Sequence, residues 1–202
     1  MTHSPDQKPP ETGSRPAEVM QTLDLARIAL FAAIIAALGL VPAIPIPFLP
    51  VPITAQTLGV MLAGAVLGSW RGMLAVLVFL ALGAVGMPVF PGGRGGLSVF
   101  MGPTAGFVFS WPVGAFVIGW LMERFGREGS FISAFLASIV GGIVVIYAGG
   151  IAWLAIVYET PFWAATTGSL AFVPGDLIKA AAAASVASSV HRVYPTLGRA
   201  GG

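Results

Sequence analysis

Six long apolar runs constrain the fold of this chain more than any other feature. They lie at about residues 24–41, 53–69, 71–86, 104–122, 131–157 and 173–190. Each is near the ~17 to 25 residues that a helix needs to cross the hydrocarbon core of a bilayer. Only 9% of the 202 residues are charged, against about 25% in a typical soluble domain. The sequence therefore predicts an all-α integral membrane protein with six transmembrane helices.

Polar segments at the two ends divide the chain into three parts. Residues 1–22 are polar and proline-rich, so we expect a flexible cytoplasmic tail. Residues 23–192 form a single six-helix transmembrane domain, and residues 193–202 form a second cytoplasmic tail. The second and third runs meet at residues 70–72, which predicts a tight antiparallel hairpin.

The basic residues indicate the orientation of the chain in the membrane. With six spans, most of them fall on one side: Lys8, Arg15, Arg27, Arg71, Arg124, Arg127, Arg192 and Arg199. By the positive-inside rule that side is the cytoplasm, so both termini are expected there. Arg94, in an outer loop, and Lys179, in the last span, are not explained by orientation. We therefore consider these two cations candidates for contact with a ligand.

The composition excludes several kinds of site. The chain has no cysteine, and His3 and His191 are its only histidines. A metal cluster, a catalytic triad and a metal cofactor are therefore not expected. The net charge of +2 is scattered along the chain instead of forming a basic patch with aromatic residues, so nucleic acid is not an expected partner.

A carboxylate and an ammonium group stand three residues apart at the head of the last apolar run. They are Asp176 and Lys179, in the segment Phe172-Val173-Pro174-Gly175-Asp176-Leu177-Ile178-Lys179. Charge within a span is costly, so it is usually paired, turned inward and functional. Pro174 suits the first helical position, which puts Asp176 in the first turn, on one face with Lys179. We interpret the pair as the floor of a binding site; the alternative is a helix-start carboxylate with a lysine extending to the interface.

The first outer connection, residues 41–52, is rich in proline and cannot be helical. We expect a stiff extended strap there. Gln56 follows just inside the second span, between Thr54 and Thr57. These polar groups either face a wet pocket or form hydrogen bonds with a neighbouring helix.

The second outer connection, residues 87–103, combines glycine with apolar side chains. Gly92 and Gly93 permit backbone conformations that other residues resist, and Phe90 supplies apolar cover. We expect this loop to close over a cavity as a lid; the alternative is an ordinary flexible connector. Arg94 is either a lid residue that meets a ligand carboxylate with its planar guanidinium or a solvated loop charge.

Four segments, in this order and spacing, resemble the BioY family, the biotin-binding S components of energy-coupling-factor (ECF) vitamin transporters. They are Val51-Pro52-Ile53-Thr54-Ala55-Gln56-Thr57-Leu58-Gly59, Gly86-Met87-Pro88-Val89-Phe90, Gly102-Pro103-Thr104-Ala105-Gly106-Phe107 and the segment around Asp176. The resemblance implies an S-component fold that captures biotin from outside a bacterial inner membrane. It also implies a transmembrane coupling protein and two ATP-binding subunits as partners, which some members lack or share. This chain has no ATP-binding motif of its own.

The chemistry of biotin fits these residues. Its ureido ring offers two N–H donors and one carbonyl acceptor, and its apolar chain ends in a carboxylate. Asp176 can accept from a ureido N–H, while Lys179 can donate to the ureido carbonyl or neutralise the carboxylate. Arg94 is a second candidate for the carboxylate. Tyr147, on the fifth span, can supply an aromatic wall or a phenolic hydrogen bond.

A stripe of alanines runs along the first span. Ala29, Ala33 and Ala37 recur every four residues, so another helix can approach this face closely. The resemblance implies that the stripe docks on the coupling protein near the cytoplasm. The alternative is packing within the bundle.

Functions from other classes stay open. An intramembrane enzyme would use Asp176 as a general acid or base with Lys179 as its electrostatic partner. We do not expect an enzyme, because beyond Asp24 at the edge of the first run the spans hold no second carboxylate or useful histidine. A channel needs polar residues through several spans, and spans three and four nearly lack them. Another vitamin is the alternative ligand within the binding class.

Overall fold

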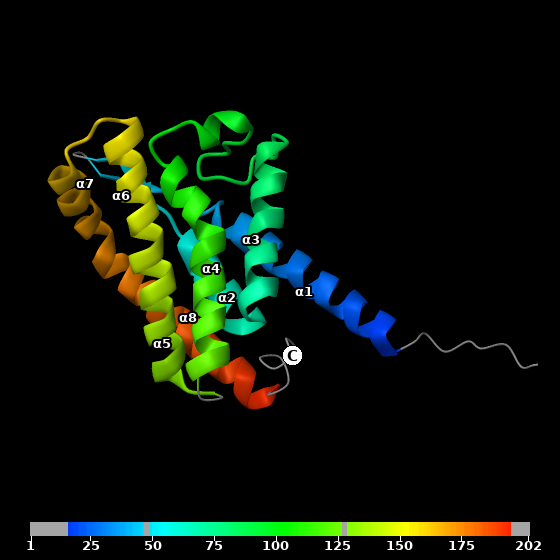
Figure 1. Cartoon of the computed structure of the whole chain (residues 1–202). Helices are drawn as coiled ribbons and strands as arrows, with labels where there is room; N and C mark the ends of the chain where they lie inside the picture. Colours follow the sequence, from blue (N-terminus) through cyan, green and yellow to red (C-terminus); the bar gives the residue numbers. More distant parts are fainter. Residues whose placement is uncertain (1–15, 47–48, 127–128, 195–202) are drawn as a thin grey trace, which may run out of the picture.

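Helices make up most of residues 16–46, 49–126 and 129–194, which are the residues that the computed structural model describes (Figure 1). The α-helices are α1 Pro16–Leu38, α2 Gln56–Leu67, α3 Ser69–Ala84, α4 Ala105–Phe125, α5 Phe131–Ile139, α6 Ile146–Val157, α7 Phe162–Ser169 and α8 Val173–Val193. Shorter elements are the strands β1 Ile44–Ile46 and β2 Leu49–Ile53, the 3-10 turns η1 Leu97–Phe100 and η3 Leu170–Phe172, and the π-helical turn η2 Val140–Val145.

The six expected spans correspond to α1, α2, α3, α4, the continuous helix from α5 through η2 to α6, and α8. Three helical stretches of the described chain are long and apolar enough to cross a membrane: Ala105–Phe125, Phe131–Val157 and Phe162–Val193. Helices α2 and α3 are apolar but have only 12 and 16 residues, fewer than the ~20 of a full span. The chain is an integral membrane protein with the helical architecture expected from its sequence.

The tight hairpin expected between the second and third spans is present, but residues 70–72, the expected connection, belong to α3, and the turn lies just before them. Helix α2 ends at Leu67, α3 begins at Ser69, and Gly68 alone separates them. Its φ of +85° lies in the left-handed region, where a side chain would be strained.

Helix α1 begins at Pro16, inside the segment that the sequence suggests as a tail. Residues 1–15 of the N-terminal tail and residues 195–202 of the C-terminal tail lie outside the described residues.

Helix α2 lies at the centre of the bundle and packs against α1, α3, α4 and α8. Close contact with α4 depends on Gly64, because a Cβ at that position would lie 2.5 Å from the Ala115 carbonyl oxygen. This central position brings the first turn of α2, with Gln56 and Thr57, against α1 and α8.

The proline-rich strap is extended, as expected, but it also folds back on itself. Strands β1 and β2 pair antiparallel, with Ile44 opposite Ile53 and Ile46 opposite Leu49. Proline has no N–H to donate to a ladder, so the pairing is short and stays at an edge. The hairpin places the end of β2 beside the first turn of α2.

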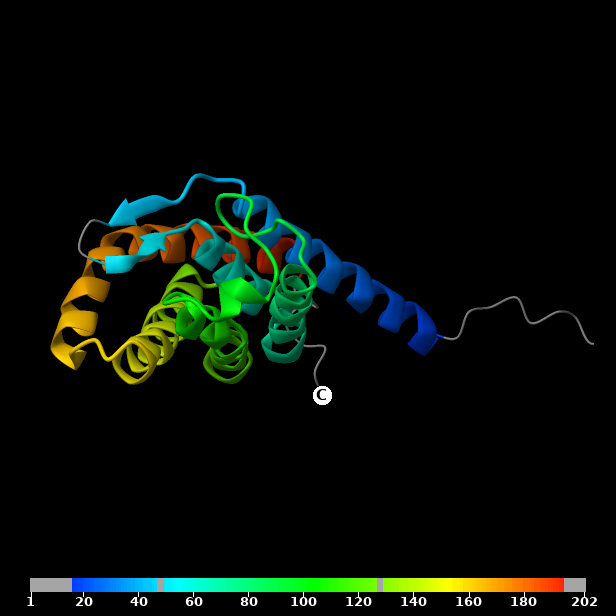
Figure 2. The same cartoon turned by 90° about the horizontal axis from the view of Figure 1, so that it is seen from above.

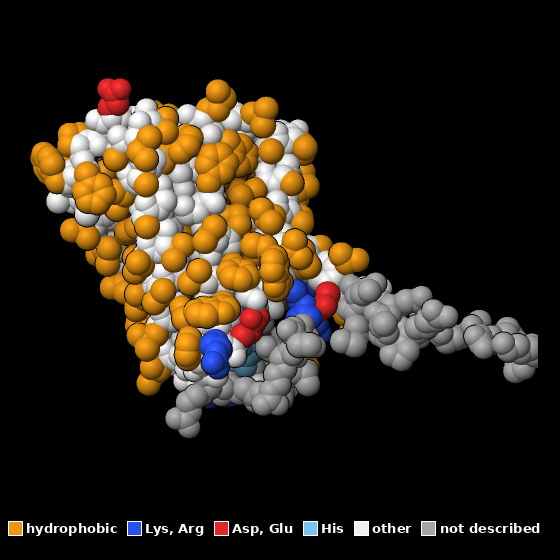
Figure 3. Space-filling view, viewed as in Figure 1, with side chains coloured by type: hydrophobic (Ala, Val, Ile, Leu, Met, Phe, Trp, Pro, Cys, Tyr) orange, Lys and Arg blue, Asp and Glu red, His pale blue; other side chains and the backbone are white. Residues whose placement is uncertain are grey.

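The two ends of the bundle differ in charge. In Figure 3 the lysine and arginine side chains gather at one end of the visible face, which we call the basic end. There Asp24 of α1 pairs with Arg71 of α3 at 3.0 Å. The carboxylate of Glu123 accepts hydrogen bonds from the N–H and the hydroxyl of Ser69, at 2.7 and 2.8 Å.

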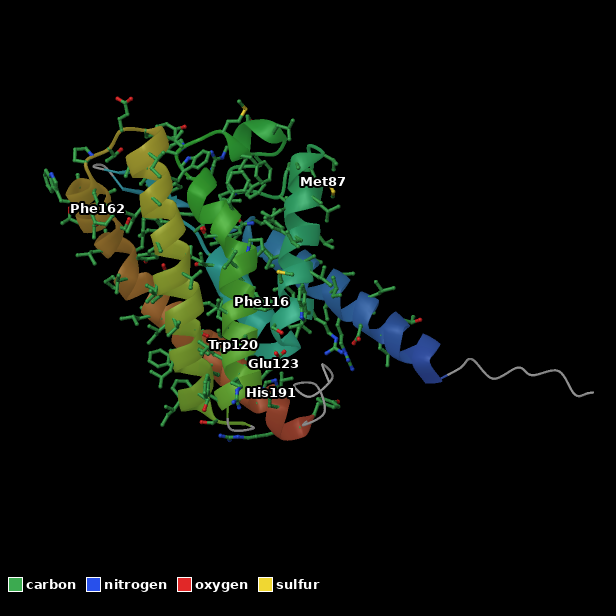
Figure 4. The ribbon with its side chains drawn as sticks, in the orientation of Figure 1. Met87, Phe116, Trp120, Glu123, Phe162 and His191 are labelled. Carbon is green, nitrogen blue, oxygen red and sulfur yellow. The ribbon has the colours of Figure 1, made fainter. Side chains whose placement is uncertain are left out.

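The opposite end carries the loop of residues 87–103, and we call it the loop end. Figure 4 shows Met87 and Phe162 at the loop end, and Glu123 and His191 at the basic end. Helix α7 was not expected from the sequence; it occupies part of the connection before the last span and exposes Phe162 and Trp163. Exposed aromatic side chains at one level are typical of the interface between membrane and water.

Candidate functional site

A cavity of about 70 Å³ opens near the loop end. Its walls come from β2, the first turns of α2, α4 and α8, the start of α6 and the loop of residues 87–103. Six of the eight residues that the sequence suggests for ligand binding line it: Gln56, Phe90, Arg94, Tyr147, Asp176 and Lys179. Gly92 and Gly93 do not. Their roles in binding remain predictions.

Asp176 is the centre of a buried hydrogen-bond network. It lies in the first turn of α8, and its side chain is only 5% exposed. Its Oδ1 accepts from Lys179 Nζ at 2.8 Å and from Thr57 Oγ1 at 3.2 Å, and its Oδ2 accepts from the Tyr147 hydroxyl at 2.7 Å. The network therefore ties α2, α6 and α8 together at one wall of the cavity.

Lys179 directs all of its N–H groups to the protein. Its ammonium donates to Asp176, to the Thr54 carbonyl at 2.6 Å and to Thr57 Oγ1 at 3.0 Å. An ammonium has three donors, so this arrangement leaves none for a ligand. Lys179 compensates the charge of Asp176 and fixes its orientation.

Asp176, in contrast, retains capacity for a ligand. A carboxylate offers about four acceptor positions, and three are used by Lys179, Thr57 and Tyr147. The free position is on Oδ2, which carries one bond. The Tyr147 oxygen, after donating its proton to Asp176, can also accept. Two neighbouring acceptors thus line the same cavity.

An aromatic wall surrounds these acceptors. The rings of Phe107, Tyr147 and Phe172 meet edge to face, with centroids 6.2 to 6.3 Å apart. All three residues line the cavity. Such a wall is suited to an apolar ring.

A π-helical turn, η2, lies directly before the part of the helix that carries Tyr147. Turns of this kind insert one extra residue into a helix and are frequent at functional sites. Helix α6 starts directly after η2, at Ile146. Ile146 and Tyr147, the first two residues after this turn, both line the cavity.

Gln56 is fully buried and joins three segments. Its Nε2 donates to the Ile35 carbonyl of α1 at 3.1 Å and to the Val89 carbonyl of the loop at 2.9 Å. Both partners are acceptors, which fixes the orientation of the amide. Its Oε1 has no hydrogen-bond partner among the described residues. Gln56 thus shows both features that the sequence offered as alternatives: it bonds neighbouring segments and it lines the cavity.

Trp111 was not predicted as a site residue. It lies in α4, is 4% exposed and lines the cavity, while its ring packs near Phe79. Its indole N–H has no hydrogen-bond partner in the part of the chain described. A buried donor without a partner costs about 1–3 kcal/mol, so this group is suited to a ligand acceptor. The available signal was a tryptophan directly before Pro112, in the middle of an apolar span.

The loop of residues 87–103 forms one side of the cavity. Phe90 is 2% exposed and packs against Phe79 and Phe100. Gly92 and Gly93 turn the backbone with φ of +76° and +71°, so that the main chains of Phe90 and Arg94 pair.

Arg94 is exposed at the mouth of the cavity. Its Nε donates to the Pro91 carbonyl at 3.2 Å. A guanidinium has five N–H donors, and this is the single bond that the structure gives it within the described residues. The rest of the group is available to an anion.

Side chains of α6 and the segment after it hold the far end of the same loop. The Trp153 indole N–H donates to the Gly102 carbonyl at 3.1 Å, and the Tyr158 hydroxyl donates to the Met101 carbonyl at 2.8 Å. The loop is therefore packed at Phe90 and tethered at Gly102.

The alanine stripe lies on the free face of α1. Ala29, Ala33 and Ala37 are exposed, whereas Ala32 and Ile35 are buried against the bundle. In Figures 1 and 2 the first half of α1 extends away from the other helices. The stripe is thus open to a partner helix or to lipid.

Comparisons with known proteins agree on one family. The BioY family profile matches residues 11–196. A protein of Rhizobium etli named biotin transporter BioY is 55% identical over 183 residues, covering 88% of this chain and 98% of that protein. Another of the same name, from Rhodobacter capsulatus, is 49% identical over 178 residues, covering 84% and 93%. A crystal structure of the S-component for biotin from an ECF-type ABC transporter superposes with a TM-score of 0.82 at 31% identity, covering 89% of this chain and 95% of the other.

Proposed function

This chain belongs to the BioY family, and we propose that it is the biotin-binding S component of an ECF-type transporter, a transport component and not an enzyme. The observation that carries this function is the Asp176 network. It holds a buried carboxylate with an unused acceptor position inside an aromatic cavity. That combination matches a flat, apolar ring system with N–H donors.

One ureido N–H of biotin would meet the acceptors at this wall, donating to Asp176 Oδ2 with the Tyr147 oxygen beside it. The other ureido N–H points away on the far side of the carbonyl, so it does not reach an acceptor only 2.7 Å from the first. Hydrogen bonds to an ionised group are the stronger kind, so Asp176 contributes the larger part. The fused rings then lie against Phe107 and Phe172, where their apolar surface is covered.

The ureido carbonyl of biotin needs a donor from the protein. Lys179 has no free N–H in the observed network, whereas Trp111 has a buried N–H without a partner among the described residues. We assign Trp111 to the carbonyl. A ligand bond there removes the cost of the buried unpaired donor, which favours the bound state.

The carboxylate of biotin would lie at the mouth of the cavity, beside Arg94. This guanidinium keeps N–H groups free, in contrast to the ammonium of Lys179. The loop of residues 87–103 acts as a lid over the chain of the ligand, with Phe90 as its apolar side and Gly92 and Gly93 as its turn.

The orientation follows from the two ends of the bundle. The basic end faces the cytoplasm of a bacterial cell and the loop end faces outward, in the inner membrane. Residues 23–192 act as one transmembrane domain, with residues 1–22, which include the first turns of α1, and residues 193–202 on the cytoplasmic side. The exposed stripe of Ala29, Ala33 and Ala37 docks on a transmembrane coupling protein, which two ATP-binding subunits energise.

Calorimetry on the purified full chain tests this function. Titration with biotin should give one site with a dissociation constant below about 1 μM, or about −8 kcal/mol. Other vitamins, such as thiamine and riboflavin, should give no binding heat. No heat with biotin would overturn the proposal, and tighter binding of another vitamin would change the ligand.

A further inference from the structure

A second and larger cavity lies outside the first. It has a volume of about 470 Å³ and opens between the strap and the loop of residues 87–103. Pro42 and Pro45 line it from the strap, and Gly92 and Ser98 line it from the loop. Arg94 lines both cavities. The two cavities are therefore consecutive chambers of one site.

The sizes of the chambers divide the ligand between them. Sites for small ligands usually measure about 300–1,000 Å³, and the inner chamber of about 70 Å³ is well below that range. The outer chamber lies within it. A ligand with its ring at Asp176 and its chain directed to Arg94 must therefore place any further extension in the outer chamber.

The lining of the outer chamber has few groups that require a specific partner on a ligand. Among its lining residues in the described chain, Arg94 is the one charged side chain; the others are proline, glycine, alanine, valine, serine and threonine. Arg94 is itself exposed, so water can solvate it when no carboxylate is present. A site rejects an analogue strongly when the analogue leaves a buried polar group unpaired, and this chamber has no such requirement.

From these observations we propose that the site also accepts biotin conjugated through its carboxylate, such as the amide with the side chain of lysine. This inference rests on the proposed biotin function. The bicyclic head occupies the inner chamber as in biotin, and the amide with its extension occupies the outer chamber. The ureido end has no such tolerance, because an analogue that cannot donate leaves the buried Asp176 without its ligand partner.

Competition against radiolabelled biotin on the purified full chain tests the proposal. The lysine amide of biotin should compete within about tenfold of biotin itself, a difference of about 1.4 kcal/mol. Biotin methylated on a ureido nitrogen should compete at least about 100-fold more weakly. If the lysine amide loses as much affinity as the methylated compound while biotin binds, the outer chamber does not accept conjugates. If biotin itself does not bind, the proposed function fails first.

Two tryptophan substitutions on the same turn test whether the extension of the conjugate occupies the outer chamber. Ser98 lines the outer chamber, and its neighbour Leu97 is exposed and lines neither chamber. Ser98→Trp should weaken the lysine amide by about tenfold or more and leave biotin nearly unchanged, because a large side chain fills the outer space. Leu97→Trp should change neither. If Ser98→Trp loses as much affinity for biotin as for the lysine amide, the assignment of the outer chamber is contradicted. It is also contradicted if Leu97→Trp loses as much affinity for the lysine amide as Ser98→Trp does.

Discussion

The Tyr147 hydroxyl donates a 2.7 Å hydrogen bond to Oδ2 of Asp176, joining α6 to α8 across the inner cavity. On the other oxygen, Lys179 and Thr57 hold the same carboxylate from α8 and α2. The carboxylate is thus fixed before a ligand arrives. A group held in place loses little entropy on binding, which increases affinity.

Replacing Asp176 by asparagine tests the ureido contact. Asp176→Asn should weaken biotin binding by about 1–3 kcal/mol, because a charged hydrogen bond is lost and the amide offers fewer acceptor positions. Calorimetry measures the affinity, and circular dichroism with size-exclusion chromatography checks the fold. Asp24→Asn at the basic end is the matched control and should bind as the wild type does. Unchanged affinity in a folded Asp176→Asn protein would remove Asp176 from the site.

The indole N–H of Trp111 gives a second prediction about binding of the ureido ring of biotin. Trp111→Phe keeps an aromatic ring beside Phe79 but removes the donor, so biotin should bind about tenfold more weakly. Trp120→Phe, at an exposed position on α4, is the control. Equal affinity for Trp111→Phe would assign the ureido carbonyl to another donor.

The lid is tested best where the loop is tethered. Proline cannot be used at Gly92 or Gly93, because it requires a φ near −65° and both glycines have positive φ. Trp153→Phe instead removes the bond to the Gly102 carbonyl and should speed biotin dissociation by several-fold, about the effect of one hydrogen bond. Trp163→Phe, exposed on α7, should leave the rate unchanged. Stopped-flow kinetics measures the dissociation rate of biotin from each variant. A Trp153→Phe rate equal to that of the wild type would mean that this tether does not control release.

The alanine stripe gives a prediction that distinguishes the exposed face of α1 from its buried face. Ala33→Trp should abolish co-purification with the coupling subunits and biotin uptake, because close approach of a helix needs small residues. Biotin binding to the isolated protein should remain. Ala32→Trp, at a buried position, should instead lower expression and stability through overpacking. Intact uptake by Ala33→Trp in the presence of the coupling subunits would exclude the stripe as the docking surface.

Much of the fold could be predicted from the lengths of the apolar runs and from the positions of glycine and proline between them. The span from Phe131 to Val157 follows directly from the sequence, and so does the hairpin between α2 and α3, although its turn lies at Gly68 and not at residues 70–72. Helix α7 and the pairing of β1 with β2 could not be predicted, because both are short and depend on tertiary contacts more than on local preference.

The binding site was likewise predictable from the sequence only in part. Asp176 and Lys179 stand out as charges in an apolar run, so the sequence identifies them. The sequence cannot show that Thr54 and Thr57 use up the donors of Lys179, since these residues lie more than a hundred positions away. Trp111 was missed because a tryptophan in a span is counted as apolar, and only the structure shows that its N–H has no partner among the described residues.

Mass spectrometry of the small molecule that leaves with the protein tests the proposed function most directly. The full chain is purified from cells grown with biotin and other vitamins, without added ligand, and then denatured to release what is bound. We expect biotin in near-stoichiometric amount from the wild type and much less from Asp176→Asn. A different vitamin in that amount, or equal biotin from both proteins, would contradict biotin capture at Asp176.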